Sequence, residues 1–242
     1  MTSAWRWVLA GVFILGTADA ATNPDTISTG AGPVEITPIQ HASFTLAAGG
    51  KLIYVDPSPA KLFSGKPKAD LIIITDIHQD HMDPGAVREL SKPGTKLIAP
   101  AAVQKTLERA EVLNNGQTTS WNGWTVTAVP MYNLKRGPAP GQLFHTKGRG
   151  NGYVLTYGNK RFYISGDTEN IAEMRALKNI DVAFVCMNLP YTMPVEEAAE
   201  AVKAFHPTIV YPYHYRGQDT RQFAKLLKGS GIEVRLRDWY AK

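Results

Sequence analysis

Cysteine is almost absent from this chain of 242 residues, which contains only Cys186. A single cysteine excludes an internal disulfide, so we expect core packing alone to stabilise the fold. Cys186 stands inside the apolar run "DVAFVCMN", where a buried thiol behaves as a small hydrophobic side chain. This interpretation is favoured over a metal ligand.

The chain also has no N-terminal apolar stretch of membrane-spanning length. The stretch from Trp7 to Gly16 follows an arginine and precedes the small-x-small tripeptide "ADA", which is the layout of a signal peptide. We expect residues 1–20 to be removed and the mature chain to be exported, periplasmic or secreted, without stable membrane insertion. An uncleaved N-terminal anchor is the alternative. No cysteine follows the cleavage pattern, which excludes a lipid anchor on cysteine.

Charge is sparse, at 19% of residues with a formal net charge of +5. This modest excess favours anionic small molecules weakly and does not provide the basic track that nucleic-acid binding requires. The hydrophobic fraction of 44% is sufficient for a real core. Without repeats or low-complexity blocks, the sequence predicts a flexible leader at residues 21–33 and one domain at residues 34–242.

The order of predicted elements indicates the fold class. Short β-type runs from "VEITPI" to "DLIIIT" precede helical patterns at residues 84–91 and 101–113. A second set of strands, from "WTVTAVP" to "RFYISGD", precedes further helical patterns, including residues 194–205. Because each strand-rich half is followed by helices, we predict an α/β fold with two packed sheets and helices outside.

Ligand-type side chains are concentrated in "TDIHQDHMD", residues 75–83, directly after the apolar run "LIII". Asp76, His78 and Asp80 alternate and project to one side of an extended segment, and His81 follows. Imidazole nitrogen and carboxylate oxygen suit zinc, and also iron or manganese. We interpret these four as metal ligands rather than as a solvated acidic loop. Asp83 is instead expected to cap a helix, because a proline follows it.

Three motifs carry a resemblance to a known family. "TDIHQDH" resembles the signature T-H-x-H-x-D-H of the metallo-β-lactamase fold superfamily. "YISGDT" resembles its later strand, which ends in a metal-bridging aspartate, here Asp167, after a glycine that permits close backbone approach. "IVYPYHY" resembles its last ligand strand, ending in His214. The opening "HASFTL…GGKLIYVDP" resembles the hairpin of the subgroup that contains ascorbate-phosphate lactonase-like proteins.

The resemblance implies an αββα sandwich of two mixed sheets with a dinuclear metal site at one edge. We expect two divalent metal ions there, with zinc favoured over manganese or iron. The sequence departs from the pattern twice: Asp76 replaces the first histidine, and Asn133 stands where a later histidine is expected. We expect His145 to fill that later role, with Asn133 as the alternative. If neither binds, a single-metal site is plausible. With His145 in that role, metal one is held by Asp76, His78 and His145, metal two by Asp80, His81 and His214, and Asp167 bridges them.

By this resemblance the chain is a dinuclear metal-dependent hydrolase. The two metals would hold a hydroxide, oriented by Asp80, that attacks a carbonyl or phosphoryl centre. The substrate would be a small, anionic ester, lactone or phosphodiester. A β-lactamase proper and a nuclease of the same fold are disfavoured rivals. The alternatives from other classes are a non-catalytic metal-dependent ligand-binding protein with a degraded site and a di-iron redox protein.

The other polar candidates each allow two interpretations of their role. His41 either supports the site or has a structural role. Five cations either rim the site and attract a carboxylate or phosphate, or belong to a solvated basic surface; they are Lys135, Arg136, Lys147, Arg149 and Arg216.

Overall fold

Each half of the chain builds one seven-stranded sheet in the computed structural model, which describes residues 24–240. In spatial order the first sheet contains β1 (Asp25–Ile27), β2 (Val34–Gln40), β3 (Ser43–Ala48), β4 (Lys51–Val55), β5 (Leu71–Ile73), β6 (Lys96–Ala99) and β7 (Glu111–Val112). The second contains β8 (Thr118–Trp121), β9 (Trp124–Met131), β10 (Gly150–Tyr157), β11 (Lys160–Ile164), β12 (Val182–Cys186), β13 (Ile209–Tyr213) and β14 (Glu233–Val234).

Both sheets follow the same topology. Strands β1 to β4 pair antiparallel and β4 to β7 pair parallel, and the second sheet repeats this with β8 to β11 and β11 to β14. The parallel strands need crossover connections, and these carry the helices. They are η1 (Ala60–Leu62), α1 (Pro84–Leu90) and α2 (Ala101–Gln104) in the first half, and α3 (Ala172–Arg175), α4 (Val195–Phe205) and α5 (Thr220–Leu226) in the second.

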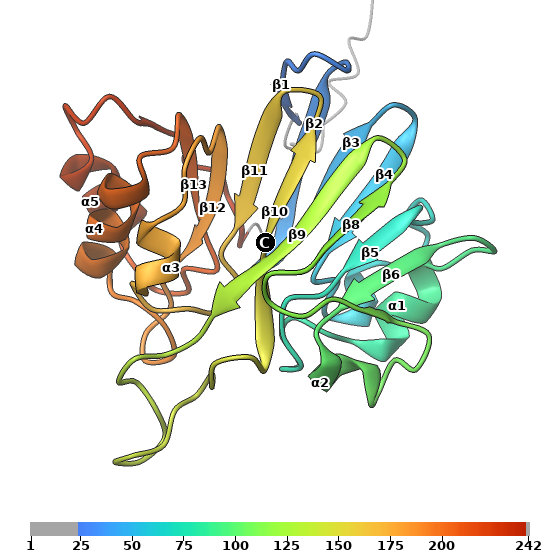
Figure 1. The fold of residues 1–242 in the computed structure, drawn as a ribbon, viewed down its shortest axis with the longest axis horizontal. Helices are drawn as coiled ribbons and strands as arrows, with labels where there is room; N and C mark the ends of the chain where they lie inside the picture. The colour runs from blue at the N-terminus through green and yellow to red at the C-terminus, as the bar shows by residue number, and fades with distance from the viewer. Residues whose placement is uncertain (1–23, 241–242) are drawn as a thin grey trace, which may run out of the picture.

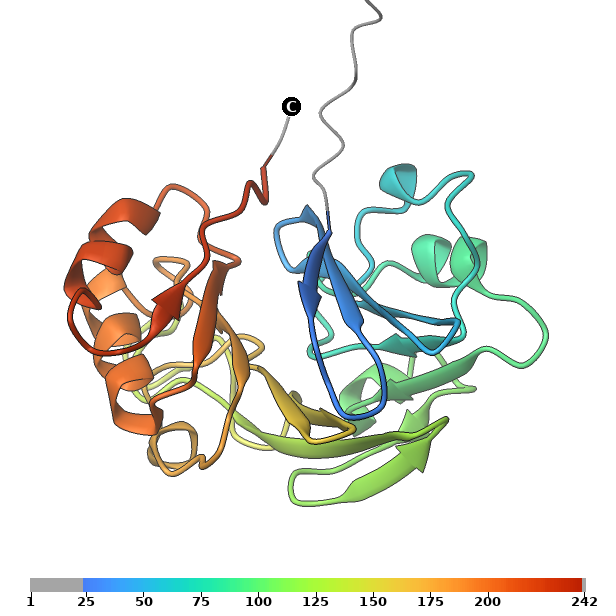
Figure 2. The same ribbon diagram turned by 90° about the horizontal axis from the view of Figure 1, so that it is seen from above.

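The layers run helix, sheet, sheet, helix. In Figure 1, α1 and α2 lie on the right of the sheets, and α3, α4 and α5 lie on the left; Figure 2 shows the same layers from above. The predicted fold class, an αββα sandwich of two mixed sheets, is therefore confirmed. The start of α1 also follows its sequence signal, because the Asp83 side chain accepts hydrogen bonds from the backbone N–H groups of Gly85 and Ala86.

The main core lies between the two sheets. The rings of Phe44 and Phe184 stack across it with centroids 4.3 Å apart, and Trp239 meets both edge-on. Cys186 is fully buried in this core, and burial raises the pKa of its thiol to about 11. It therefore packs as a small apolar side chain, and it belongs to none of the candidate metal-binding groups found among the described residues.

Two segments differ from expectation. The helix predicted at 101–113 ends at Gln104, because residues 111–112 form β7 and pair with Ile98 and Ala99 of β6. Sheet formation overrides the helical pattern there. The leader predicted at 21–33 contains β1, whose Ile27 is buried. Its Asp25 binds the guanidinium of Arg237 at 2.6 Å, which ties the segment to the body of the domain.

Within residues 24–240 no helix combines the length and the apolar character that a membrane crossing requires. The expected signal peptide, residues 1–20, lies outside the described residues.

Candidate metal centre

The predicted ligands gather at one edge of the sandwich because they follow strands that end there. Residues 76–81 come directly after β5, Asp167 after β11 and His214 after β13, while His145 lies in the β9–β10 connection. Loops beyond the carboxyl ends of parallel strands are where α/β folds place their sites. All seven predicted ligands fall into three overlapping groups: Asp76 with His78 and His145, His81 with Asp167 and His214, and Asp80 with His41 and His214.

The group formed by His81, Asp167 and His214, here called the deep group, is buried and centred on Asp167. Its Oδ2 atom lies 3.4 Å from His81 Nε2, and its Oδ1 atom lies 3.4 Å from His214 Nδ1. Oδ2 is also 3.2 Å from His145 Nε2, which belongs to the outer group. Asp167 therefore lies between the two groups and contacts histidines of both.

The group formed by Asp76, His78 and His145, here called the outer group, is centred on Asp76, whose side chain is fully buried. Its Oδ2 atom lies 2.8 Å from His78 Nδ1 and 3.8 Å from His145 Nε2. Burial opposes ionisation of Asp76, but the hydrogen bond from His78 and the surrounding positive charge outweigh it and hold its pKa below the usual value. Asp76 is thus a carboxylate, held in the place that the signature usually gives to an imidazole.

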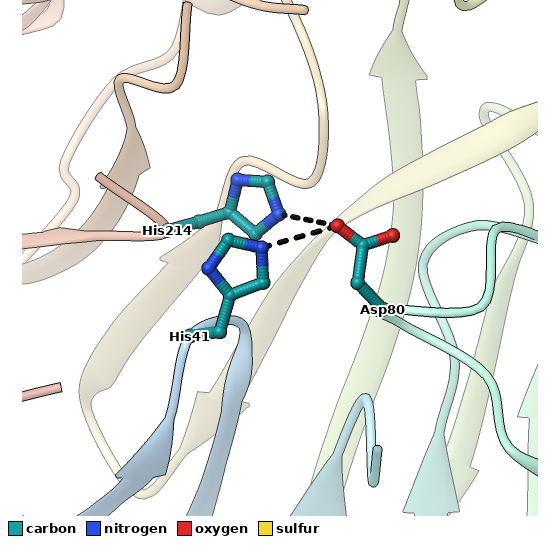
Figure 3. A group of neighbouring side chains, drawn as sticks. All are labelled: His41, Asp80 and His214. Carbon is teal, nitrogen blue, oxygen red and sulfur yellow. Dashed lines mark hydrogen bonds and ion pairs between the residues drawn. The ribbon is translucent and has the colours of Figure 1, made fainter. Parts of the chain in front are cut away.

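The third group, shown in Figure 3, consists of His41, Asp80 and His214. It lies at the mouth of the site, where the side chain of Asp80 is 41% exposed. Asp80 Oδ2 accepts hydrogen bonds from His41 Nε2 at 3.1 Å and from His214 Nε2 at 3.4 Å. The sequence grouping placed Asp80 with His81 and His214, whereas the structure places it with His41 and His214. His41, whose role was open, thus contacts two of the predicted ligands.

The ionisation states at the mouth follow from burial and these contacts. Burial lowers the pKa of His41 to about 4, although its hydrogen bond with Asp80 acts in the opposite direction. Burial alone would raise the pKa of Asp80, but the hydrogen bonds from His214 and His41 outweigh it and hold that pKa well below its usual value. A neutral His41 therefore faces an ionised Asp80 near neutral pH.

Three histidines have one ring nitrogen engaged outward and the other free toward the centre. His81 Nδ1 donates to Asp56 Oδ2 at 2.8 Å, His145 Nδ1 donates to Asn133 Oδ1 at 2.7 Å, and His214 Nε2 donates to Asp80. These contacts fix the tautomers, so that the inner nitrogen of each ring carries a lone pair.

The inner atoms have no hydrogen-bond partner among the described residues. The four buried atoms in question are His81 Nε2, His145 Nε2, His214 Nδ1 and Asp167 Oδ1. Unpaired buried polar atoms are rare, because each costs the full desolvation penalty of the group. Metal ions would satisfy all four, so the residues present fit divalent cations bound by nitrogen and oxygen.

Asp56, to which sequence reasoning gave no role, is the buried partner of His81. It accepts hydrogen bonds from Thr75 N at 2.7 Å, Thr75 Oγ1 at 2.6 Å and His81 Nδ1. Burial raises the pKa of Asp56 against the pull of these contacts. A carboxylate behind a ligating histidine orients the ring and makes it more basic. The available signal was an acidic residue directly after the strand "KLIYV".

Asn133 supports His145. Its Oδ1 atom accepts from both the backbone N and the ring Nδ1 of His145, each at 2.7 Å, and its amide nitrogen donates to Glu169 at 3.0 Å. The amide oxygen is thereby committed to His145. Glu169, also missed from the sequence, is 1% exposed and accepts from the backbone N of Arg136 at 2.8 Å, which fixes the start of the β9–β10 connection.

Three of the six non-glycine residues with positive φ within residues 24–240 lie at this edge. His41, Asp56 and His214 have φ values of 56°, 45° and 48°, a region that non-glycine residues rarely adopt. Gly166 has φ 59°, and a Cβ atom there would lie 2.5 Å from Met131 Sδ. Strained residues of this kind persist where the surroundings hold them for function.

A cavity of about 370 Å³ opens over the deep and outer groups. Phe144 and Tyr191, with ring centroids 5.0 Å apart, form an apolar part of its wall. The lining residues are His78, Gln79, Asp80, Phe144, His145, Asp167, Asn188, Tyr191 and Arg216.

Four of the five candidate cations are paired with carboxylates. Lys135 and Arg136 contact Glu197 at 3.0 and 2.8 Å, Lys147 contacts Glu173, and Arg149 contacts Asp76 at 2.9 Å. Arg216 lines the cavity, and its side chain has no ion pair within residues 24–240. The cations of the β9–β10 connection therefore hold it to the domain. Of the five candidates, Arg216 is the one whose charge is available to an anionic ligand in the cavity.

Comparison with known proteins agrees with this geometry. Residues 35–214 match the model of the Beta-lactamase superfamily domain, so the chain belongs to the metallo-β-lactamase superfamily. A UPF0173 metal-dependent hydrolase of Thermococcus onnurineus is 32% identical over 225 residues, covering 83% of this chain and 95% of the relative. Within the superfamily, the chain is a member of the UPF0173 metal-dependent hydrolase family.

Solved structures give the same result. A candidate metal-dependent hydrolase from Parabacteroides distasonis is 43% identical, with a TM-score of 0.84 over 88% of this chain and 97% of that one. The metallo-β-lactamase fold protein YhfI from Bacillus subtilis is 16% identical, with a TM-score of 0.65 over 82% of this chain and 89% of that one, and shows the fold alone. The lactonase subgroup stays a prediction.

Proposed function

We propose that this metal-dependent hydrolase holds two divalent ions, with zinc favoured over manganese or iron, and cleaves a small anionic ester, lactone or phosphodiester. The observation that carries the proposal is the set of four buried, unpaired ligand atoms on His81, His145, His214 and Asp167 beneath an open cavity. Divalent ions bound there would supply a hydroxide nucleophile near neutral pH and Lewis-acid polarisation of a carbonyl or phosphoryl oxygen.

The chain's own residues have distinct tasks in this reaction. Asp76, Asp167 and the four histidines of the deep and outer groups hold the ions. The partners behind the rings of His81, His145 and His214 keep the inner lone pairs of these rings aligned. Asp80 is ionised and exposed to the cavity, so it is placed to accept a proton from an attacking water and to orient it. Phe144 and Tyr191 pack against an apolar part of the substrate and exclude water from that side.

An anionic substrate is supported by Arg216. The test compares KM for an anionic ester or lactone with KM for its neutral analogue. Arg216→Gln is expected to raise KM about 10-fold or more for the anionic compound only, because one charge-assisted contact is lost. Lys147→Gln is the matched control, since Lys147 is already paired with Glu173. Equal effects on both compounds would assign Arg216 no role in recognising charge.

The metal mechanism is tested by metal content and by turnover. Elemental analysis of protein purified without added metal is expected to give close to two zinc or manganese ions per chain. Asp167→Ala and His81→Ala are expected to abolish hydrolysis. His206→Ala is the control, because His206 is exposed and bonds Ser230 O at the end of α4. Unchanged hydrolysis in both site variants would refute the metal mechanism.

Other outcomes select the alternatives. Two iron ions per chain would favour a di-iron redox protein. Two bound ions without turnover of esters, lactones or phosphodiesters would favour a ligand-binding protein.

Export of the mature chain is proposed from the sequence of residues 1–20. Mass spectrometry of the protein secreted by its own host is expected to give an N-terminus at Ala21. An intact Met1 in a membrane fraction would favour the uncleaved anchor.

A further inference from the structure

The negative charge of Asp76, in the outer group, is paired with the positive charge of Arg149. Arg149 Nη2 lies 2.9 Å from Asp76 Oδ2, and Arg149 Nε lies 3.3 Å from Oδ1, so the guanidinium contacts both carboxylate oxygens. A two-point arginine–carboxylate contact of this kind is strong and directional. The Asp76 side chain is fully buried and that of Arg149 is 24% exposed, so little solvent screens the pair.

The deep and outer groups therefore differ in net charge. Each contains one carboxylate and two histidines that are neutral when they bind a metal. Asp167 contacts histidines of both groups, so its charge is common to them. The deep group has two further carboxylates against its histidines, Asp56 on His81 and Asp80 on His214, and neither has an arginine or lysine partner within residues 24–240. The outer group's own carboxylate, Asp76, is offset by the +1 charge of Arg149.

Arg149 has a second contact that must be separated from its charge. Its Nη1 atom donates to the backbone oxygen of Phe144 at 2.7 Å, directly before His145. Removing the side chain could therefore loosen a ligand as well as change the field. Lysine at position 149 keeps the positive charge but loses the two-point guanidinium contact. Glutamine loses the charge but keeps a hydrogen-bond donor.

We propose that Arg149 neutralises Asp76 and so sets the strength and metal preference of the outer group. The Asp76–Arg149 pair then acts electrically as one neutral ligand. The outer group binds its ion more weakly than the deep group, and it prefers hard cations such as Mn²⁺ less than an unpaired carboxylate would. This inference rests on the proposed function, because it assumes that both groups hold metal.

The test is a charge cycle on metal-stripped protein, with dissociation constants for Zn²⁺ and Mn²⁺ from chelator competition. Arg149→Gln is expected to tighten the weaker site about 10-fold, and more for Mn²⁺ than for Zn²⁺. Arg149→Lys is expected to stay within about threefold of wild type, since the charge remains. Lys147→Gln, in the same connection but paired with Glu173, is the control for any loss of a loop cation.

The second arm exchanges the ligand itself. Asp76→His leaves the Arg149 cation without its carboxylate and is expected to weaken the outer site about 10-fold or more. The double variant D76H/R149Q replaces the neutral pair by a neutral imidazole and is expected to recover most of that loss. Circular dichroism of each metal-free variant checks that it is folded.

The outcomes separate the inference from the proposed function. Weakening of the outer site by both Arg149→Gln and Arg149→Lys would overturn the charge role and leave Arg149 as a holder of the His145 loop. No rescue in the double variant would overturn it as well. A wild-type chain that binds no metal would refute the proposed function, whereas two ions bound with affinities unchanged by Arg149→Gln would refute only this inference.

Discussion

Asp56→Asn offers a direct test of how the candidate ligand histidines are held. The substitution keeps the size of a buried side chain that accepts three hydrogen bonds, but it replaces one acceptor oxygen with a donor and removes the charge behind His81. Loss of such a supporting carboxylate typically costs 10- to 100-fold in metal affinity, so we expect the deep site to weaken by about 1.4–2.7 kcal/mol.

The same change destabilises the metal-free protein. A buried donor facing another donor leaves a polar group unsatisfied, which costs about 1–3 kcal/mol. For a domain of this length that corresponds to a fall in Tm of roughly 2–12 °C. The assay is thermal unfolding with and without Zn²⁺, together with chelator competition for the dissociation constant.

Two further variants make the result interpretable. Asp70→Asn is the matched control, because Asp70 also accepts a backbone N–H on the first sheet, from Leu52 at 3.0 Å, but contacts lysines rather than a ligand. It is expected to change stability without changing metal affinity. Thr75→Val removes one contact to Asp56 and is expected to weaken metal binding by less than Asp56→Asn does. A dissociation constant for Asp56→Asn within twofold of wild type would refute the reasoning.

Three other predictions follow from the contacts around the site. His145→Ala is expected to lower metal occupancy more than Asn133→Ala, because one removes a ligand atom and the other only its support; elemental analysis checks this, and the reverse order would make Asn133 the ligand. Glu197 has its pKa lowered chiefly by the hydrogen bond from Arg136. A lowered folded-state pKa stabilises the protein above the unfolded value, so Glu197→Gln is expected to cost about 1 kcal/mol at pH 7. That difference should shrink as the pH falls below about 4.3 and vanish below the folded pKa, and urea unfolding across pH measures it; a pH-independent difference would contradict the linkage. Gly166→Ala is expected to destabilise by about 1–3 kcal/mol, because φ is positive and a Cβ meets Met131, whereas the same change at exposed Gly229, with open space around it, should cost about 1 kcal/mol for the backbone alone.

The sequence was sufficient for the fold class and for the neighbourhood of the site. Strand periodicity, the order of strand-rich and helical stretches and the family motifs together predicted the two sheets with outer helices. The ligand-type residues after β5, β11 and β13 were predicted to converge, and the structure brings them to one edge. They could be read because strand ends and ligand chemistry are local properties of the chain.

Several features were not readable in this way. Asp56 lies 25 positions before His81, and Glu169 lies 36 positions after Asn133, so neither pairing has a local signal. The helix predicted at 101–113 was wrong beyond Gln104, because pairing of β7 with β6 is a tertiary preference that a helical pattern cannot reveal. The basic loop looked like an anion-binding rim, yet its lysines and arginines meet acidic partners from distant segments.

The sequence by itself therefore determined which chemical groups are available and which strands carry them, because composition and periodicity act over a few residues. Only the tertiary structure decided how those groups are paired. Burial makes an unpaired charge or lone pair costly, so each carboxylate and imidazole takes the partner that folding brings within reach. That is why Arg149 meets Asp76, why Asn133 accepts a hydrogen bond from the ring of His145, and why Asp80 lies beside His41 at the mouth of the site.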